Sequence, residues 1–226
     1  PDWLREVMSV GNDYHWLKQS PWKHNLLNST MLGLVLAAYA ATLLAGAWIS
    51  PWIYIPLATF GLGCLLFSLY ILVIHECSHT MFLLHKDRER SRRWNHFLGR
   101  VFASLLFTDY LTHWAEGHVT HHLHPVEEID PQNPDPLDGK RLLKHSLLLL
   151  VPGTAMAINP SQKYGFSMER LLPGALVHGG LAVAGGLLIH WQVALVVLWA
   201  FNGAAALNLT KIALSSRSCS SGCTRS

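Results

Sequence analysis

Histidine stands out among the residue types that could do chemistry in this 226-residue chain. The 14 histidines nearly match the 17 lysines and arginines, a proportion that packing does not explain. His75 and His79 are four residues apart at the end of a long apolar run. Residues i and i+4 share one face of a helix, so both imidazoles can reach one metal ion. This pair alone is weak evidence, because so histidine-rich a composition yields roughly one such pair by chance.

A denser group of histidines follows later in the chain. His118, His121 and His122 form an HxxHH pattern, whose i, i+3 and i+4 positions share one helical face. His113 lies two turns before His121, and His124 stands next to a proline, where a helix ends. Chance produces such a triple far less often than a single pair, so the spacing favours a metal site over a histidine-rich solvated loop.

The two groups together indicate the kind of metal site. Imidazole suits iron, zinc and copper. The groups supply five nitrogen ligands, more than the four that one tetrahedral zinc ion takes. The pattern therefore indicates a site able to hold two metal ions and argues against a zinc hydrolase.

The composition places this site in a membrane protein. Half of the residues are hydrophobic and 14% are charged, whereas soluble chains carry roughly 25% charged residues. Such hydrophobicity excludes a disordered chain, and four cysteines are too few for a disulfide scaffold. A net charge of +3 with both signs mixed excludes a nucleic-acid partner.

Two long uncharged stretches predict four membrane spans. No Lys, Arg, Asp or Glu occurs between Lys23 and Glu76, and a turn at Ser50 divides this stretch. A second stretch, 171–210, divides at a turn near residue 190. The predicted spans are 28–48, 54–75, 171–189 and 192–213. Gly179–Gly180 and Gly185–Gly186 suit close helix contact in lipid.

The charges predict the topology. All lysines and arginines that flank the spans fall on one side: Lys18, Lys23, Lys86, Arg88, Arg90, Arg92, Arg93, Lys140, Arg141, Lys144 and Lys211. The positive-inside bias then places both termini and both histidine groups on the cytoplasmic face of a multi-pass integral membrane protein. Two shorter apolar runs, 97–107 and 142–158, are expected to be amphipathic segments at that face. The predicted fold is all-α, with four transmembrane helices and a cytoplasmic cap of amphipathic helices.

The two histidine motifs resemble those of a known superfamily. HECSH at 75–79 closes the second predicted span, and HVTHH at 118–122 precedes the third. This arrangement resembles the membrane fatty acid desaturase and hydroxylase superfamily, which are histidine-box di-iron proteins. The resemblance covers about residues 24–214 and is specific for the superfamily rather than for one reaction. It implies two non-haem iron ions (Fe²⁺) that use O₂ and two electrons on an unactivated C–H bond of a lipid acyl chain.

The resemblance also implies the site residues. The metal ligands carried over are His75, His79, His118, His121 and His122, with His113, His124 and Asn208 as weaker candidates. Glu76 and Glu116 are candidates to orient the imidazoles. Asp130 is a third candidate but is expected to be a solvated surface acid. His178, inside a predicted span, is either functional or bonded to a neighbouring helix.

One motif of the family has no counterpart. The family carries a third histidine box after the fourth span, but no histidine follows His190. Residues 215–226 match nothing upstream, so we expect a single domain at 1–214 and a disordered or out-of-frame tail. Cys219 and Cys223 are not expected to substitute as ligands. With the third box missing, these 226 residues are expected to insert into the membrane but to be inactive.

The motifs leave the reaction open among related alternatives. A fatty acid desaturase acting on acyl-lipid or acyl-CoA is favoured. Glu116-Gly117-His118 followed by Asp130-Pro131 also resembles alkane hydroxylases, and a carotenoid hydroxylase or ketolase is a further alternative. A non-enzymatic metal carrier would carry ligands along its spans rather than at one face. The chain has no dinucleotide or haem-attachment motif, so electrons are expected from a separate ferredoxin or cytochrome b5 type donor.

Overall fold

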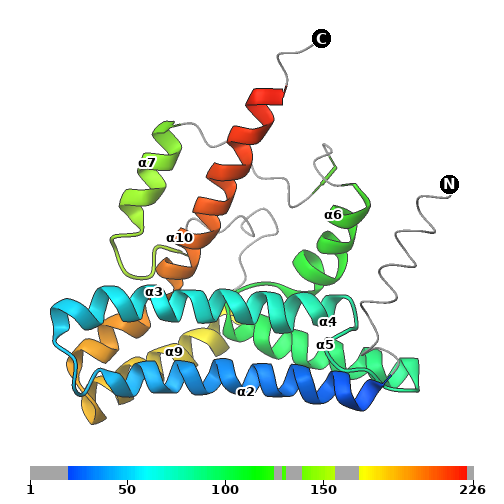
Figure 1. Cartoon of the computed structure of the whole chain (residues 1–226), viewed down its shortest axis with the longest axis horizontal. Coiled ribbons are helices and arrows are strands. Elements are labelled where there is room, and N and C mark those ends of the chain that lie inside the picture. The colour runs from blue at the N-terminus through cyan, green and yellow to red at the C-terminus, as the bar shows by residue number, and fades with distance from the viewer. Residues whose placement is uncertain (1–19, 125–128, 131–138, 156–167, 223–226) are drawn as a thin grey trace.

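The computed structural model describes residues 20–124, 129–130, 139–155 and 168–222, and every regular element among them is a helix (Figure 1). In chain order the helices are α2 (Pro21–Ala45), α3 (Pro51–Leu69), η2 (Tyr70–His75), α4 (Glu76–Ser78), α5 (Arg88–Leu105), η3 (Tyr110–His118), α6 (Val119–Leu123), α7 (Gly139–Leu148), α9 (Met168–Leu188) and α10 (Trp191–Gly222). The elements η2 and η3 are wider π-helices, which often mark functional sites.

Within the described part of the chain, three helical stretches are long and apolar enough to cross a membrane, as an integral membrane protein requires. They are Pro21–Ala45, Pro51–Ser78 and Trp191–Thr210. The second joins α3, η2 and α4 into one crossing. The apolar part of α9, Leu172–Leu188, is shorter and lies at the lower limit of spanning length. Three of the four predicted spans therefore have spanning length, and the fourth stays a prediction.

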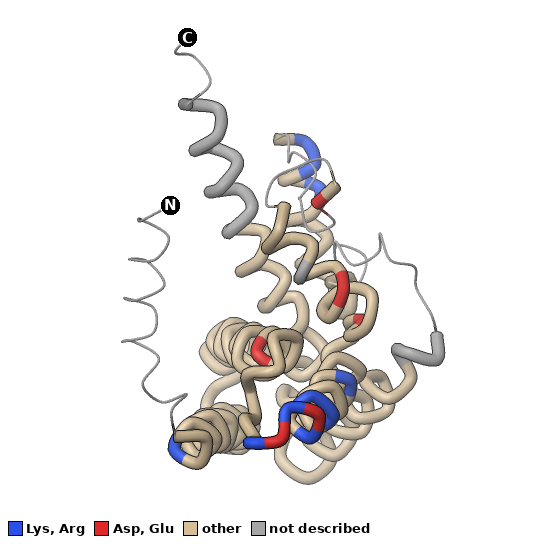
Figure 2. The backbone as a smooth tube through the Cα atoms, turned by 90° about the vertical axis from the view of Figure 1, so that its right-hand side faces the viewer, with Lys and Arg blue, Asp and Glu red and all other residues tan. Residues whose placement is uncertain are grey.

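The helices pack around α3. The antiparallel helix α2 contacts one side of α3, and α10 packs against α3 and α9. Figure 1 shows α5 and α9 following each other in a row beside α2 and α3, while α10 tilts away from the bundle. Viewed from the end in Figure 2, the axes of α2, α3 and α5 run in a similar direction.

The backbones of α3 and α10 approach each other closely at two glycines. A Cβ atom on Gly63 would lie 2.6 Å from the carbonyl carbon of Gly203, so only glycine lets the two backbones meet. The sequence indicated close helix contact at two glycine pairs. In one pair, a Cβ atom on Gly185 would lie 2.7 Å from the side chain of Val193, across the turn into α10. Neither Gly179 nor Gly180 has a described neighbour within 4 Å of its Cβ position. Gly185 therefore makes a close contact of the predicted kind, and for Gly179 and Gly180 close contact stays a prediction.

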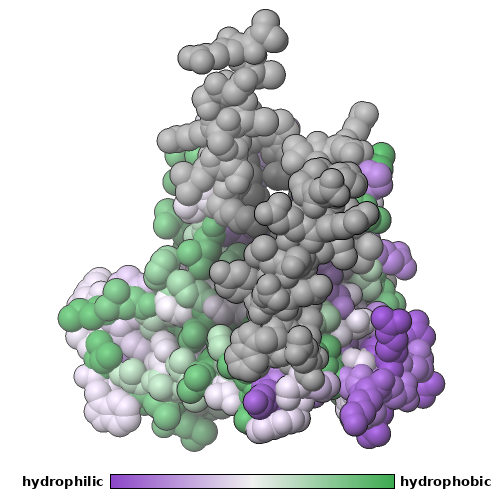
Figure 3. Space-filling view, turned by 45° about the vertical axis from the view of Figure 1, so that its right-hand side comes forward, coloured by the Kyte–Doolittle hydropathy of each residue, from purple (hydrophilic) through white to green (hydrophobic). Residues whose placement is uncertain are grey.

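Helix α5 differs from the predicted surface segment at 97–107. The carboxylate of Asp87 caps the helix by accepting hydrogen bonds from the backbone N–H groups of Glu89 and Arg90, at 2.9 and 3.3 Å. The charged side chains of the first half of α5 are exposed, and hydrophilic surface gathers there (Figure 3), whereas Ser91 and Asn95 on its inner face are buried. The second half packs against η2 and α9 and buries Ala103. Residues 97–105 are therefore half of a longer helix that lies beside the spans.

The predicted segment at 142–158 begins as α7, which buries none of its residues. The buried amide of Asn202 on α10 holds the turns that follow α7: its Nδ2 donates to Leu149 O at 2.9 Å and Val151 O at 2.5 Å, and its Oδ1 accepts from Ala155 N at 3.2 Å. Residues 156–158 lie outside the described part of the chain. Helix α10 continues to Gly222 and so includes most of the segment predicted as a tail.

Candidate metal centre

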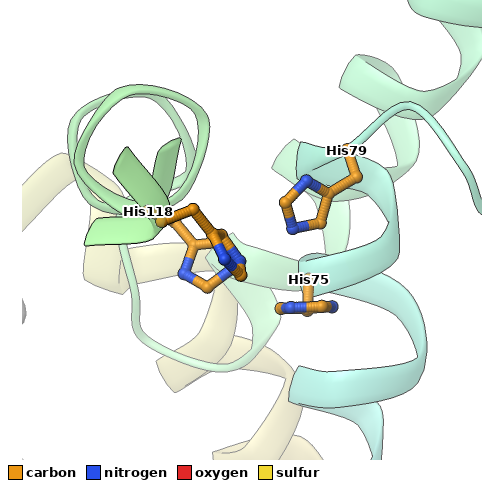
Figure 4. A group of neighbouring side chains, drawn as sticks. His75, His79 and His118 are labelled. Carbon is orange, nitrogen blue, oxygen red and sulfur yellow. The ribbon is translucent and has the colours of Figure 1, made fainter. Parts of the chain in front are cut away.

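Four of the five histidines carried over as metal ligands come together. His75 ends η2, His79 follows α4, His118 ends η3 and His122 lies on α6. One nitrogen from each ring lies within 4.8 Å of the nitrogens of the other three. Figure 4 shows the rings of His75, His79 and His118 facing one another from two separate helical segments. We call these four residues the four-histidine group.

A tyrosine joins the two segments that carry this group. The hydroxyl of Tyr110, at the start of η3, donates to the backbone oxygen of Cys77 in α4 at 2.9 Å. Its ring lies against Gly99 of α5, where a Cβ atom would lie 2.1 Å from the ring. Gly99 therefore leaves the space that Tyr110 needs, and the bond to Cys77 fixes η3 beside the first histidine pair.

The π-helices end at the histidines themselves. Ser78 Oγ donates to the backbone oxygen of His75 at 2.6 Å, which secures the last turn of the crossing. The side chain of His118 is buried, and its Nε2 lies 3.0 Å from Nε2 of His122. Two nitrogens each about 2.1 Å from one ion, at about a right angle, are about 3.0 Å apart. This spacing fits two ligands of one metal ion.

The electrostatics of the group also fit a metal. Burial lowers the pKa of His79, and the neighbouring His75 and His122 lower it further. A lowered pKa keeps the imidazole neutral, which is the form that binds metal. The four-histidine group offers only nitrogen, a donor set that suits iron, zinc or copper better than magnesium or calcium.

Trp114 forms one wall of the four-histidine group, although it was not among the predicted site residues. Its ring centroid lies 5.4 Å from that of His118 and 6.4 Å from that of His75. Its Nε1 donates to Thr108 Oγ1 at 3.2 Å, which fixes the indole. The signal in the sequence was the spacing of Trp114 and His118 at i and i+4, which places both on one helical face.

The fifth predicted ligand, His121, lies outside the four-histidine group and pairs with a carboxylate. Its Nδ1 lies 2.8 Å from Asp130 Oδ2, and Asp130 is buried. The expectation that Asp130 is a solvated surface acid is therefore wrong. A carboxylate that holds Nδ1 fixes the orientation of the ring and leaves Nε2 free to bind metal. The His121 ring stacks on His118 at 5.9 Å between centroids, so it borders the group.

Glu76 and Glu116, the two acids expected to orient imidazoles, differ in whether they contact a histidine. Glu76 Oε1 lies 3.1 Å from Nδ1 of His75, as an orienting carboxylate would. Glu116 is exposed on η3, and among the described residues no contact joins its carboxylate to a histidine. Both assignments stay predictions, and the contact seen among the described residues is that of Glu76 with His75.

His113 and His124, two of the weaker ligand candidates, do not belong to the four-histidine group. His113 is half-buried against Trp114, and burial lowers its pKa to about 4. His124 follows α6 outside the four-histidine group, and Asn208 lies half-buried on α10. His178 bonds a neighbouring segment, since its Nε2 donates to the backbone oxygen of Leu105 at 3.1 Å. This bond supports the structural alternative for His178.

Comparison with protein families agrees with the fold and the site. The model of the fatty acid desaturase family matches residues 50–214, which is most of the chain and includes all five box histidines. The chain belongs to the fatty acid desaturase family. The predicted resemblance is thereby confirmed, and the class is that of a membrane desaturase- or hydroxylase-type oxidoreductase. No curated protein and no solved structure matches the chain.

Proposed function

We propose that this protein, with a third histidine box to complete the ligand set, desaturates a lipid acyl chain with O₂ and two electrons. Two non-haem iron ions would be held in part by His75, His79, His118, His121 and His122. The observation that carries the proposal is the convergence of four imidazole nitrogens from two separate segments to within 4.8 Å. Family membership supports the reaction class. Iron, when bound, supplies the oxidising power for an unactivated C–H bond that amino-acid side chains lack.

The chain's own residues hold and shield the site. Glu76 and Asp130 accept hydrogen bonds from Nδ1 of His75 and His121, so that Nε2 of each ring is left to face a metal. Trp114 packs over His75 and His118 and excludes water from that side. Tyr70 stacks on Trp114 at 6.3 Å and extends this apolar wall down into the span.

The proposed setting follows from the helices and the charges. The site lies where the crossing Pro51–Ser78 ends, at the level where an acyl-lipid or acyl-CoA chain can enter from the bilayer. The charged half of α5 follows this crossing and supports a cytoplasmic face for the site. We propose that a separate ferredoxin or cytochrome b5 type protein delivers the electrons at this face.

Hydroxylation of an alkane, fatty acid or carotenoid is the second candidate function. The observation that favours it is the buried Asp130 bonded to His121, because the resemblance to alkane hydroxylases involves Asp130. A membrane metal carrier is disfavoured, because the four ligands gather at the end of a span rather than along it.

Metal analysis and product analysis test the proposal together. Detergent-purified protein that also carries a third histidine box should hold close to two iron ions per chain, and His118→Ala should lose most of this iron. The 226 residues alone, which lack that box, should hold less iron than this. His190→Ala is the matched control, because His190 lies in the turn between α9 and α10. With reductase, electron carrier and O₂ supplied, the protein with a third box should remove two mass units from an acyl substrate if it desaturates, or add sixteen if it hydroxylates. The 226 residues alone should give no product above the His118→Ala level. Full iron retention in His118→Ala would sink the proposal.

A further inference from the structure

We propose that three asparagines, Asn25, Asn28 and Asn95, position His79 for metal binding by holding the backbone of residues 80–84. We call these three residues the asparagine clamp. The inference rests on the proposed function, since it assigns residues that act on the same metal site through His79. None of the three asparagines belongs to the four-histidine group.

The first side of the clamp comes from α2. Asn25 makes a reciprocal pair with Leu84: its Nδ2 donates to Leu84 O at 2.9 Å, and its Oδ1 accepts from Leu84 N at 2.8 Å. Asn28, one turn later on the same face, donates from Nδ2 to Phe82 O at 2.9 Å. His24 Nε2 donates to Met81 O at 2.6 Å. The start of α2 is therefore bound to the chain directly after His79.

The second side comes from α5. Asn95 is fully buried, and its Oδ1 accepts from Leu83 N at 3.1 Å while its Nδ2 donates to Leu83 O at 2.7 Å. Ser91, one turn earlier, donates from Oγ to the same oxygen at 2.7 Å. Asn95 Nδ2 also donates to Ser91 O at 2.8 Å, which ties the amide to its own helix. Residues 81–84 are thus held between two helices.

The clamped segment needs these partners. Residues 80–84 lie in turns and bends rather than in a helix, so their backbone groups lack the regular bonds of a helix. Buried backbone groups without hydrogen-bond partners destabilise a fold. Thr80 has a φ of +57°, a strained conformation for a β-branched residue. A strained residue next to His79 persists only when the surrounding structure holds it.

The clamp acts on the site through Thr80, which joins the held segment to His79. The backbone N–H of Met81 donates to Glu76 O at 2.8 Å. The chain therefore folds back over α4, the short helix between His75 and His79. Removing the clamp lets Thr80 relax, which moves the His79 ring away from the other three nitrogens. The four ligands would remain in the chain, but their geometry would no longer be held ready for the metal.

The test compares leucine variants at the clamp with a leucine variant at another buried amide. Leucine keeps the branched shape of asparagine, although its two methyl groups are larger, and it removes the hydrogen bonds. Asn202→Leu is the matched control, because Asn202 is also buried and bonded to backbone groups, but of residues 149–155. Asn25→Leu, Asn28→Leu and Asn95→Leu should weaken Co²⁺ binding in metal-free protein at least tenfold and broaden the Co²⁺ absorption bands. Asn202→Leu should lower the thermal midpoint with unchanged affinity and bands.

A metal-free measurement separates the clamp from the proposed function. Diethyl pyrocarbonate should modify His79 faster in the clamp variants than in the unaltered protein, with His190 as the internal reference. Asn25→Asp keeps the acceptor for Leu84 N and should restore part of the difference. If Asn95→Leu does not fold, Asn25→Leu and Asn28→Leu decide the outcome. Unchanged modification of His79 in both would overturn the clamp, whereas a protein that binds no metal in any form would overturn the proposed function alone.

Discussion

The side-chain amide of Gln192 donates to the backbone oxygen of Gly46 at 2.5 Å. It also donates to Ile49 O at 2.9 Å, and the Gln192 side chain is buried. The turn before α10 is thereby bound to the turn between α2 and α3. The chain leaves this end in α3 and returns to it in α9, so the two turns that carry no charge share one end of the bundle. Their shared position supports α9 as a return crossing despite its short apolar length.

This relationship predicts where labels will reach the chain. Trp48 and Trp191 are exposed beside the bonded turns, at 80% and 54% of their surface, whereas Gln192 itself is buried. In a background without the native cysteines, Trp48→Cys and Trp191→Cys should both react with an impermeant maleimide added outside intact cells. Glu89→Cys on α5 should react only after the membrane is opened. Labelling of Trp48→Cys and Trp191→Cys from opposite sides would contradict the arrangement.

The α3–α10 contact predicts a large difference between two neighbouring glycines. A methyl group at Gly63 would meet the backbone of Gly203 at 2.6 Å, and backbone cannot move aside. Gly63→Ala should therefore cost about 1–3 kcal/mol of stability by overpacking and should lower the thermal midpoint in detergent. Gly61→Ala is the control on the same helix, because no described residue lies within 4 Å of its Cβ position. Equal midpoints for the two variants would argue against the contact.

Much of the fold could be read from the sequence because its signals are local. The absence of charge between Lys23 and Glu76 marks two crossings, and Ser50 with the following proline marks the helix start between them. The spacing within each histidine box could likewise be read, since i and i+4 share a helical face. What brings His75 and His118 together could not, because it depends on Tyr110 reaching the backbone of another element.

The missed features are contacts between segments distant in sequence. Asn25 and Asn95 are ordinary polar residues until the fold brings both to one segment. Asp130 looks like any surface acid in a polar stretch, and only its burial beside His121 shows otherwise. Gly63 and Gly203 have no pattern in common with the adjacent glycine pairs that the sequence made conspicuous. Periodicity reports which face a residue occupies, but it does not report which partner that face meets.

The pairing of His121 with Asp130 predicts a specific loss of metal affinity. Asp130→Asn keeps the shape but weakens the hold on Nδ1 of His121, so metal affinity should fall about 10- to 100-fold. Glu116→Gln is the matched control, since Glu116 is exposed and should leave affinity unchanged. Co²⁺ titration of metal-free protein measures both. Equal affinity in the two variants would remove Asp130 from the site.

The half-buried side chain of His113 is expected to make the stability of the metal-free protein depend on pH. Burial lowers its pKa to about 4, against a weaker opposing effect of Asp109, whereas an unfolded chain holds histidine near 6.5. Between these values the unfolded state binds a proton that the folded state does not, so the contribution is complete above pH 6.5 and is lost as the pH falls towards 4. At pH 5 the loss is about 2 kcal/mol, from about 1.4 kcal/mol per pKa unit.

Replacing His113 by phenylalanine should remove this dependence. The thermal midpoint, followed by tryptophan fluorescence in detergent with chelator at pH 7.5, 6 and 5, should fall less steeply in His113→Phe than in the unaltered protein. His85→Phe, at an exposed position in the loop before α5, controls for the loss of one histidine. A midpoint that falls equally in all three proteins would show that His113 is protonated as easily in the folded chain as in the unfolded one.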